Sequence, residues 1–187
     1  MPMKKNKVLV TGAAGFLGSH LAEWFADNGH DVKILIRHDS NRQFIEDDRY
    51  TKVIGDVCKP ESLRGAVANV EAIVHAAGLT KAGNEQEFDS VNDAGTKNLL
   101  EAAEQVLGLR RFVYVSSLAA HGPSKTGNPR SADADPLPVS AYGRSKLKGE
   151  VRVLSYSDRW PVTIIRPTII YGPRDQQTLA FFDMAKM

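Results

Sequence analysis

The sequence predicts an α/β fold with a doubly wound parallel sheet, arranged as three layers with helices on both faces. Apolar runs alternate with helical patterns along the chain, and a turn with three glycines joins the first run to the first helical pattern. Several runs, such as 112–115, are apolar at nearly every position. Strands buried on both faces have this composition, and they are typical of parallel sheets covered by helices.

The first part of the chain predicts three strands and two helices. In order they are Lys7–Thr11 (strand), 16–28 (helix), 32–37 (strand), 39–45 (short helix or loop), 52–54 (strand) and 60–67 (helix). Gly29 suits the left-handed position that follows a helix, so it ends the first one. Pro60 suits the first turn of a helix, where its missing N–H costs nothing. Gly55 and Asp56 end the third strand.

The second part continues the alternation. The expected elements are 72–76 (strand), 85–106 (long helix), 111–116 (strand), 140–154 (helix) and 162–166 (strand). Val91, Leu99 and Ala103 give the long helix an apolar face. The segment 122–138 is rich in Pro, Ser, Gly and Asp, which predicts a mobile loop beside the site rather than a domain linker.

Composition limits the class of protein. The 187 residues suffice for one well-buried domain, and the formal net charge of +2 gives no reason to expect nucleic acid or an anionic membrane as partner. Cys58 is the one cysteine, so no intrachain disulfide is expected. No run approaches the ~20 apolar residues that span a bilayer, and the first residues do not form a secretory signal. We expect a soluble, cytoplasmic protein.

A glycine-rich turn at 11–18 directly follows the first apolar run. Gly12 allows the tight turn, Gly15 lets the backbone approach phosphates, and Gly18 lets the helix pack close to the strand. The following helix offers unpaired N–H groups and a positive dipole end to an anion. The pattern predicts a dinucleotide pyrophosphate site. The alternative is a turn that serves only strand–helix packing.

Tyr142 and Lys146 are four residues apart in an expected helix, so they share one face. A phenol has a pKa of about 10 and is a poor base near neutrality. A nearby ammonium stabilises the phenolate, as does the positive charge of an oxidised nicotinamide. By itself this spacing is common on helix surfaces.

Ser116 and Ser117 stand at the carboxyl end of the strand expected over 111–116, where ligands of such sheets bind. A hydroxyl there can hydrogen-bond a substrate oxygen that gains or loses a proton. The alternative is that the serines end the strand or cap the next turn, and one serine can serve each role.

Together these motifs resemble the extended branch of the short-chain dehydrogenase/reductase superfamily, which contains nucleotide-sugar epimerases, dehydratases and related reductases. The resemblance covers nearly the whole chain, in seven segments in order: 11–18, 55–57, 75–78, 91–96, 115–117, 142–146 and 166–173. It implies a Rossmann fold that binds a nicotinamide dinucleotide. Because seven motifs occur in the family's order, we interpret the Tyr142–Lys146 spacing as part of the site rather than as a chance pair on a helix surface.

The resemblance also implies roles. Tyr142 would transfer the proton, Lys146 would lower its pKa and hold the nicotinamide ribose, and Ser117 would orient the substrate oxygen. Ser117 is preferred to Ser116 because the family's serine lies five residues before a glycine, here Gly122. The implied cofactor-binding residues are Gly12, Gly15, Phe16, Leu17, Arg37, Asp56, Val57, Ala76, Ala77, Gly78, Tyr142, Lys146, Pro167 and Thr168.

Arg37 departs from the family pattern for NAD, in which an acidic residue usually ends the second strand. A cation there suits the 2′-phosphate of NADP, although Asp39 offers a competing carboxylate. The sequence therefore favours NADP over NAD. His121 replaces a frequent tyrosine, and an ordinary loop histidine is expected there. His75 is expected to be structural, and no cluster has metal-ligand spacing, so no metal is expected.

Two enzymatic functions and one other remain open. The first is an epimerase or oxidoreductase acting on a nucleotide sugar, and the second is an NADP-dependent reductase or dehydrogenase of a small carbonyl or sterol-like substrate. Dehydration is disfavoured because Leu118 and Ala119 replace the acidic pair of family dehydratases. The third is a non-catalytic dinucleotide sensor, which retention of Ser117, Tyr142 and Lys146 disfavours.

The resemblance also sets the expected organisation. Residues 1–174 would form the NAD(P)-binding domain with its catalytic residues. Residues 175–187 would begin a helix leading to a missing carboxyl-terminal part that shapes the substrate pocket, so the chain alone would be a weak catalyst. A homodimer through the two long helices is common in the family and is an open expectation here.

Overall fold

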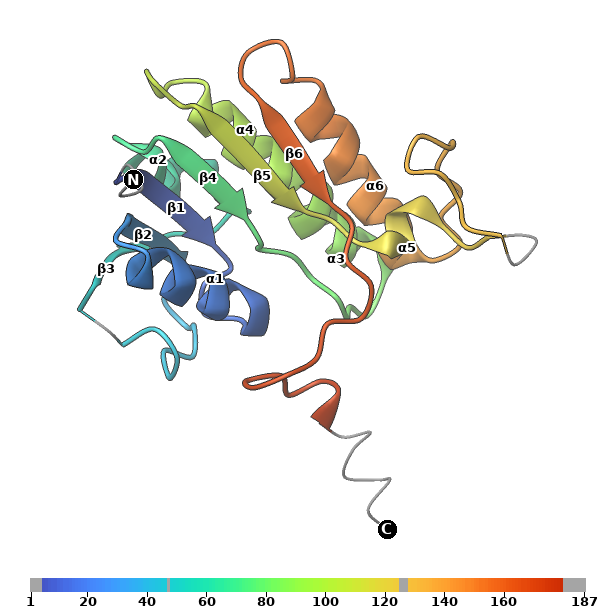
Figure 1. The fold of residues 1–187 in the computed structure, drawn as a ribbon, viewed down its shortest axis with the longest axis horizontal. Coiled ribbons are helices and arrows are strands. Elements are labelled where there is room, and N and C mark those ends of the chain that lie inside the picture. The colour runs from blue at the N-terminus through green and yellow to red at the C-terminus, as the bar shows by residue number, and fades with distance from the viewer. Residues whose placement is uncertain (1–4, 47, 125–127, 180–187) are drawn as a thin grey trace.

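Six parallel strands form one sheet in the order β3-β2-β1-β4-β5-β6 in this computed structural model, which describes residues 5–46, 48–124 and 128–179 (Figure 1). The strands are β1 (Lys7–Thr11), β2 (Asp31–Ile36), β3 (Tyr50–Ile54), β4 (Ala72–His75), β5 (Arg111–Val115) and β6 (Val162–Ile165). The helical elements are α1 (Phe16–Asp27), η1 (Pro60–Ser62), α2 (Arg64–Val67), α3 (Glu85–Asp89), η2 (Ser90–Gly95), α4 (Thr96–Ala103), α5 (Leu118–His121) and α6 (Ala141–Leu154). This is a Rossmann fold, as predicted.

Two apolar cores lie on opposite faces of the sheet, because side chains alternate along each strand. Val8 and Val10 point to the core that α1 covers, together with residues of β2 such as Ile34. Leu9 points to the other core, where Leu99 of α4 and other side chains of α2, α4 and α6 pack. Figure 1 shows α1 in front of β1, β2 and β3, and α4 and α6 behind the sheet. The continuous apolar runs of the strands are explained by burial on both sides.

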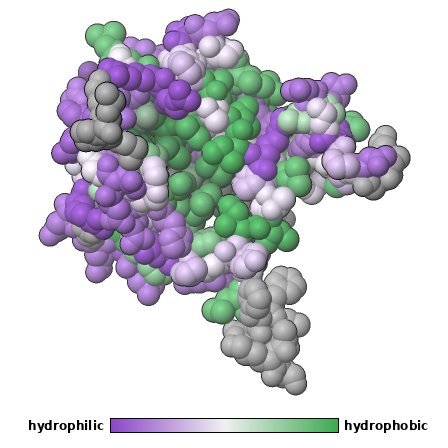
Figure 2. Space-filling model, viewed as in Figure 1, coloured by the Kyte–Doolittle hydropathy of each residue, from purple (hydrophilic) through white to green (hydrophobic). Residues whose placement is uncertain are grey.

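One part of the front face is open. Val115 pairs with Ile165 in the ladder between β5 and β6, and both point to the side that α1 covers elsewhere. Ile165 is exposed, and Figure 1 places no helix of the described ranges in front of β5 and β6. Figure 2 shows apolar surface through the middle of this face. The three-layer arrangement is therefore complete only over the first half of the sheet.

The strand order reverses between β1 and β4, which pair with each other in the middle of the sheet. Crossovers from β1 and β4 leave in opposite directions at this point, so a crevice opens beyond their carboxyl ends. The Gly12 turn follows β1 and the segment 76–78 follows β4. The topology thus brings the glycine turn beside the motif that follows His75.

The long helix expected over 85–106 is three consecutive elements, α3, the π-helical segment η2 and α4, and it ends at Ala103. The hydroxyl of Thr96, the first residue of α4, donates to the Asn92 carbonyl of η2. Gly95 packs so closely on Val57 that a Cβ would lie 2.8 Å from the Val57 methyl. A π segment widens one turn of the helix, and such segments occur often at functional sites. The expectation of one uninterrupted helix was wrong because these tertiary contacts decide its course.

Smaller differences have local causes. The helix expected over 60–67 is split into η1 and α2, since the Leu63 amide donates to the carbonyl three residues earlier. Residues 39–45 form turns rather than a helix. α5 was not expected, and it begins where the Ser117 hydroxyl accepts from the Ala119 amide. Several elements begin or end one or two residues from their expected bounds.

Two expectations fall partly outside the described ranges. The helix expected from 175 onward starts at Leu179, and residues 180–187 lie outside the described residues. Residues 125–127 of the loop expected over 122–138 also lie outside them. Of the rest of that loop, Leu137 donates its amide to the His121 carbonyl, which ties the loop to α5.

Candidate active site and cofactor cleft

A cleft of about 1270 Å³ runs along the carboxyl ends of the strands. Its walls come from the turn after β1, the ends of β2 to β5, the start of α6 and the segment after β6. All the residues expected to act in catalysis or cofactor binding line it, namely Gly12, Gly15, Phe16, Leu17, Arg37, Asp56, Val57, Ala76, Ala77, Gly78, Ser117, Tyr142, Lys146, Pro167 and Thr168. The fold therefore brings segments from 12 to 168 to one cavity.

The glycine turn has the geometry of a phosphate cradle. Gly12 has a φ of +71°, and a Cβ there would lie 2.8 Å from the Ala76 carbonyl oxygen. Gly15 begins α1 and supplies no side-chain cap, while Phe16 and Leu17 of the first helical turn line the cleft. An uncapped helix N-terminus at a cleft fits a diphosphate group. The residues present thus fit the pyrophosphate of a dinucleotide.

His75, the last residue of β4, is buried where the two halves of the sheet meet. Its Nδ1 lies 2.7 Å from the Thr11 hydroxyl, and its Nε2 lies 3.0 Å from the Thr96 hydroxyl. The ring is fully buried, and burial, with the nearby charge of Lys146, lowers the pKa of His75 to about 3. A neutral imidazole held between two hydroxyls ties β1, β4 and α4 together, in keeping with the expected structural role.

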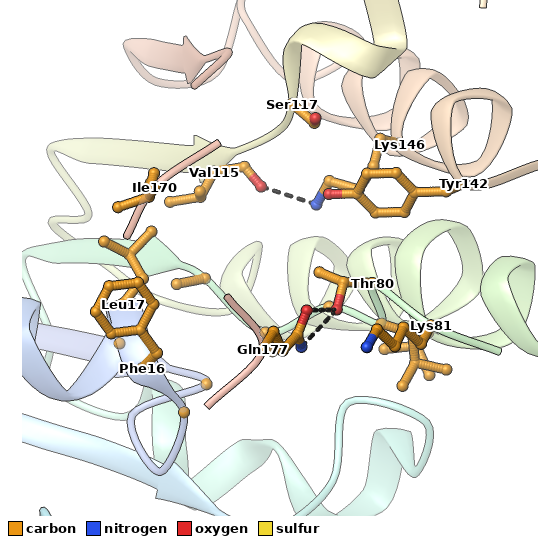
Figure 3. Close-up of a pocket in the computed structure, with 18 of the residues that line it drawn as sticks. Phe16, Leu17, Thr80, Lys81, Val115, Ser117, Tyr142, Lys146, Ile170 and Gln177 are labelled. Atoms are coloured by element: carbon orange, nitrogen blue, oxygen red, sulfur yellow. Dashed lines mark hydrogen bonds between the residues drawn. The ribbon is translucent and has the colours of Figure 1, made fainter. Parts of the chain in front are cut away.

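Tyr142 and Ser117 both line the cleft, and Figure 3 shows them at the same end of it as Lys146. Ser140 caps α6 by accepting from the Gly143 amide, which places Tyr142 in the first turn of the helix. Burial raises the pKa of the Tyr142 phenol, and the nearby Ser117 hydroxyl acts in the opposite direction. The phenol is therefore protonated near neutrality and is placed to give its proton to an acceptor in the cleft.

Lys146 lies one helical turn beyond Tyr142, and Figure 3 shows both side chains at the same end of the cleft. Its Nζ donates to the Val115 carbonyl at 2.8 Å and lies 4.3 Å from the centroid of the Tyr114 ring. Only 4% of the residue is exposed. Burial lowers the pKa of Lys146 to about 7, although the charge of Glu150 raises it in part. The ammonium is thus held where it can stabilise a phenolate.

The structure distinguishes the two serines. The Ser116 hydroxyl donates to the Glu150 carboxylate and is buried. The Ser117 hydroxyl caps α5, and both serines line the cleft. Ser116 is taken up by its contact with Glu150, and the preference for Ser117 as the catalytic serine stays a prediction.

Two buried polar groups at the site were not expected. Asn92 of η2 donates to the Ser145 hydroxyl at 2.9 Å and to the Leu79 carbonyl at 3.0 Å, and it accepts from the Leu79 amide. Glu150 is 1% exposed and binds Arg166 through two guanidinium nitrogens. The spacing of 142, 146 and 150 along one helix face is a signal that could have identified Glu150.

Arg37 lies at the opposite end of the cleft from the catalytic groups, beyond β2. Its Nε is 3.3 Å from the Asp39 carboxylate, and both side chains are exposed. The Ser40 hydroxyl accepts from the Arg37 amide. The competing carboxylate that the sequence indicated is therefore the actual partner of Arg37 in the absence of a ligand.

His121 is not the ordinary loop histidine that was expected. It ends α5 and is 3% exposed. Its Nε2 lies 2.9 Å from the Ser131 carbonyl oxygen, and its Nδ1 lies 3.4 Å from Arg166. These contacts link α5 to the following loop, so His121 packs within the protein rather than facing the cleft.

A comparison with protein families matches residues 8–184 to the NAD dependent epimerase/dehydratase family. The chain belongs to that family. The ceramide reductase of Caulobacter vibrioides (strain NA1000 / CB15N) is 36% identical over 181 residues, which are 97% of this chain and 51% of that protein. The UDP-glucose 4-epimerase of Vibrio cholerae is 31% identical over 178 residues, 90% of this chain and 53% of that protein. The chain spans about half the length of these curated relatives.

Solved structures of the epimerase/dehydratase family have the same fold. The UDP-glucuronic acid 4-epimerase of Bacillus cereus in complex with NAD has a TM-score of 0.79 and 28% identity, covering 94% of this chain and 60% of that one. The dTDP-glucose 4,6-dehydratase DesIV of Streptomyces venezuelae with NAD bound has a TM-score of 0.83 and 26% identity, covering 96% of this chain and 62% of that one. NAD is thus bound in structural relatives.

No helix of the described residues combines the length and apolar character needed to cross a bilayer. Within the same ranges, no three His, Cys, Asp or Glu side chains gather as metal ligands would.

Proposed function

We propose that this chain is the cofactor-binding and catalytic part of an NAD(P)-dependent oxidoreductase that reduces a carbonyl group or oxidises the corresponding alcohol. The observation that carries the proposal is the convergence of Ser117, Tyr142 and Lys146 at one end of a cleft whose middle holds the Gly12 turn. The Gly12 turn would hold the pyrophosphate of a dinucleotide, and Tyr142 and Lys146 would hold its nicotinamide half.

A bound nicotinamide would supply the hydride for reduction, or accept it in the reverse direction. Tyr142 donates its phenolic proton to the substrate oxygen as the carbonyl carbon becomes an alcohol carbon. The Ser117 hydroxyl donates a hydrogen bond to the same oxygen and orients it. Lys146 stabilises the phenolate that Tyr142 leaves, and the Val115 carbonyl holds the ammonium in place. In oxidation Tyr142 takes the proton back.

We propose NADP as the preferred dinucleotide. Arg37 lines the cleft at the end of β2, where the ribose of the adenosine half reaches the sheet. A guanidinium makes charge-assisted hydrogen bonds to a phosphate, and the exposed Asp39 can be displaced at little cost because surface ion pairs contribute little stability. NAD remains the cofactor seen in the solved relatives named above.

The substrate end of the cleft favours a carbonyl compound with an apolar body. Leu118, Val139, Ile169 and Ile170 all line the cleft, and each is exposed. Leu118 follows Ser117 directly, and its amide donates to the Pro167 carbonyl, so this apolar surface adjoins the catalytic groups. Apolar lining supplies binding energy to an apolar substrate and no partners to sugar hydroxyls or phosphates. The likeness to a ceramide reductase agrees with this class.

A nucleotide-sugar epimerase is the second candidate. The 31% identity to a UDP-glucose 4-epimerase and the fold of the UDP-glucuronic acid 4-epimerase favour it. An epimerase reuses its cofactor in every cycle, so it retains NAD, whereas a reductase exchanges its cofactor with the solvent.

Purification of the full-length protein followed by mass spectrometry of the co-purifying small molecules tests both proposals. The reductase is supported by rapid exchange with added NADPH and by NADPH consumption with long-chain or sterol-like ketones. Tightly held NAD, with turnover of a UDP-sugar, would instead establish the epimerase. No turnover of either class together with dinucleotide binding would favour a non-catalytic sensor.

We also propose a homodimer through α6 and the helices beside it. Ion pairs between α6 and the neighbouring elements join Arg144 to Glu85, Lys148 to Asp89 and Arg152 to Asp93. Next to them Val151 and Leu154 remain exposed at 59% and 51%. Sedimentation of the full-length protein decides between dimer and monomer, and Val151→Glu is expected to dissociate the dimer.

A further inference from the structure

Glu150 is a buried carboxylate one helical turn beyond Lys146 on α6. It is 1% exposed, and a buried carboxylate is costly unless its oxygens are paired. Arg166, which follows β6, donates from Nη2 at 2.7 Å and from Nε at 3.0 Å. The Ser116 hydroxyl donates to Oε1. Glu150 thus joins α6 to the ends of β5 and β6, and the mechanism above does not use it.

Ser116 lies in the chain between Val115 and Ser117, the two residues that lie next to the catalytic pair of Lys146 and Tyr142. On one side, the Val115 carbonyl accepts from Lys146. On the other side, the Ser117 hydroxyl caps α5 and acts to lower the pKa of the Tyr142 phenol. A hydrogen bond that fixes Ser116 therefore fixes the backbone on both sides of it, where a displacement of about 1 Å would move both Val115 and Ser117 relative to the catalytic pair.

We propose that Glu150 is a positioning residue, which through Ser116 holds the junction of β5 and α5 against Tyr142 and Lys146 and through its charge sets the protonation of that pair. The proposal rests on the proposed function of Tyr142 and Lys146. It concerns a residue that does not reach the cleft and so does not touch the substrate.

The charge part follows from the groups around Lys146. Tyr142 and Glu150 face it from α6, Tyr114 from β5, His75 from β4, and Arg166 is bound to Glu150 after β6. His75 is neutral near pH 7 because its pKa is about 3, and burial raises the pKa of Tyr114 above its ordinary value. The charges that act on the pair are therefore those of Glu150 and Arg166.

Replacing Glu150 by Gln keeps an acceptor for Ser116 and removes one negative charge, while the positive charge of Arg166 stays. The extra positive charge favours the deprotonated forms of both Tyr142 and Lys146. We therefore expect the pKa of the Tyr142 phenol to fall by about one unit in E150Q. A loss of packing alone would not move this pKa in a fixed direction.

The test is an NMR titration of protein carrying 13Cζ-labelled tyrosine, with the Tyr142 signal assigned through Y142F. The matched control is E85Q, since Glu85 binds Arg144 of the same helix through two nitrogens but on an exposed face. A fall of the phenol pKa in E150Q with none in E85Q supports the proposal. An unchanged pKa in E150Q, or an equal change in E85Q, overturns its charge part.

The geometric part is tested with S116A, which keeps the charge of Glu150 and removes one hydrogen bond. We expect amide hydrogen exchange at Ala119, which Ser117 caps, to speed up about tenfold. The Gly143 amide, capped by Ser140, is the internal control and stays unchanged. An unchanged exchange rate at Ala119 in S116A would refute the positioning role of Glu150 through Ser116. If E150Q does not fold, this measurement alone decides whether the proposal holds. Neither readout needs turnover, so a failure of the proposed function is detected separately, by turnover of Y142F.

Discussion

The ammonium group of Lys146 donates a hydrogen bond to the carbonyl oxygen of Val115 at 2.8 Å. That carbonyl belongs to the last residue of β5, where the strand ladder to β6 also ends. The position of the ammonium is therefore set by the sheet as well as by α6. A rigid strand end holds a charge more accurately than a loop does, and this suits a group that must stabilise a phenolate beside it.

Replacing Tyr142 by Phe is expected to lower kcat about 100- to 10,000-fold, because the phenol is the proposed proton donor and acceptor. Binding of the dinucleotide is expected to stay within a few-fold, since the ring and the turn at Gly12 are kept. Steady-state kinetics and cofactor titration measure the two effects. Y156F is the matched control, because Tyr156 stacks on Trp160 beyond the end of α6. A Y142F variant with most of its turnover would remove Tyr142 from the mechanism.

Lys146 makes stability depend on pH. Its pKa is about 7 in the folded chain against an ordinary value of 10.5 for lysine, so between these limits the unfolded state holds a proton that the folded state lacks. The free energy of unfolding therefore rises with pH from about 7 to 10.5, by up to about 1.4 kcal/mol per pH unit from this group. Below pH 7 its full cost is present.

Urea unfolding at pH 7, 8 and 9 measures this dependence. K146M is expected to lose the rise and to exceed the parent in stability at pH 7, since it buries no ammonium. K148M is the control, because Lys148 is exposed and paired with Asp89, and it is expected to keep the rise. Parallel pH dependences for K146M and the parent would show that the lysine is not desolvated.

Arg37→Asp tests the cofactor preference. Reversing the charge at the end of β2 is expected to lower kcat/KM for NADPH by about 10- to 100-fold, as for loss of a charged hydrogen bond, and to leave the value for NADH nearly unchanged. Arg42→Asp, in the same loop but outside the cleft lining, controls for net charge. If R37D and R42D have the same ratio of NADPH to NADH activity, Arg37 does not read the 2′-phosphate.

The doubly wound sheet, and the grouping of the candidate site residues along one cleft, could be predicted from the sequence because both rest on local patterns. Each pattern can be recognised from a few neighbouring residues. The patterns are the apolar run before Gly12, the helix spacing of Tyr142 and Lys146, and the serine after β5. Parallel strands then bring their carboxyl ends to one edge, so residues far apart in sequence had to meet there.

What the sequence did not predict depends on contacts between distant segments. The break in the helix over 85–106 follows from Gly95 packing on Val57. The burial of Glu150 depends on Ser116 and Arg166, which lie 34 and 16 residues away. The helix spacing shows that Glu150 shares a face with Lys146, but it does not identify partners on other segments. Without those partners, a carboxylate in a helix is expected to be exposed to solvent.

Gly12→Ala is expected to destabilise the fold by about 3 kcal/mol or more. The residue has a φ of +71°, which disfavours any Cβ, and the added atom would lie 2.7 Å from the Ala77 amide nitrogen and 2.8 Å from the Ala76 carbonyl oxygen. Both neighbours are backbone atoms just after β4, so relief of the clash requires β1 and β4 to move apart.

Gly29→Ala is the matched control, because Gly29 has a φ of +80° and open space where its Cβ would be. It is expected to cost only about 1 kcal/mol, the conformational part alone. Thermal unfolding compares the stability of the two variants directly. Equal losses of stability would mean that the close approach of the Gly12 turn to the end of β4 does not contribute to the cost of Gly12→Ala.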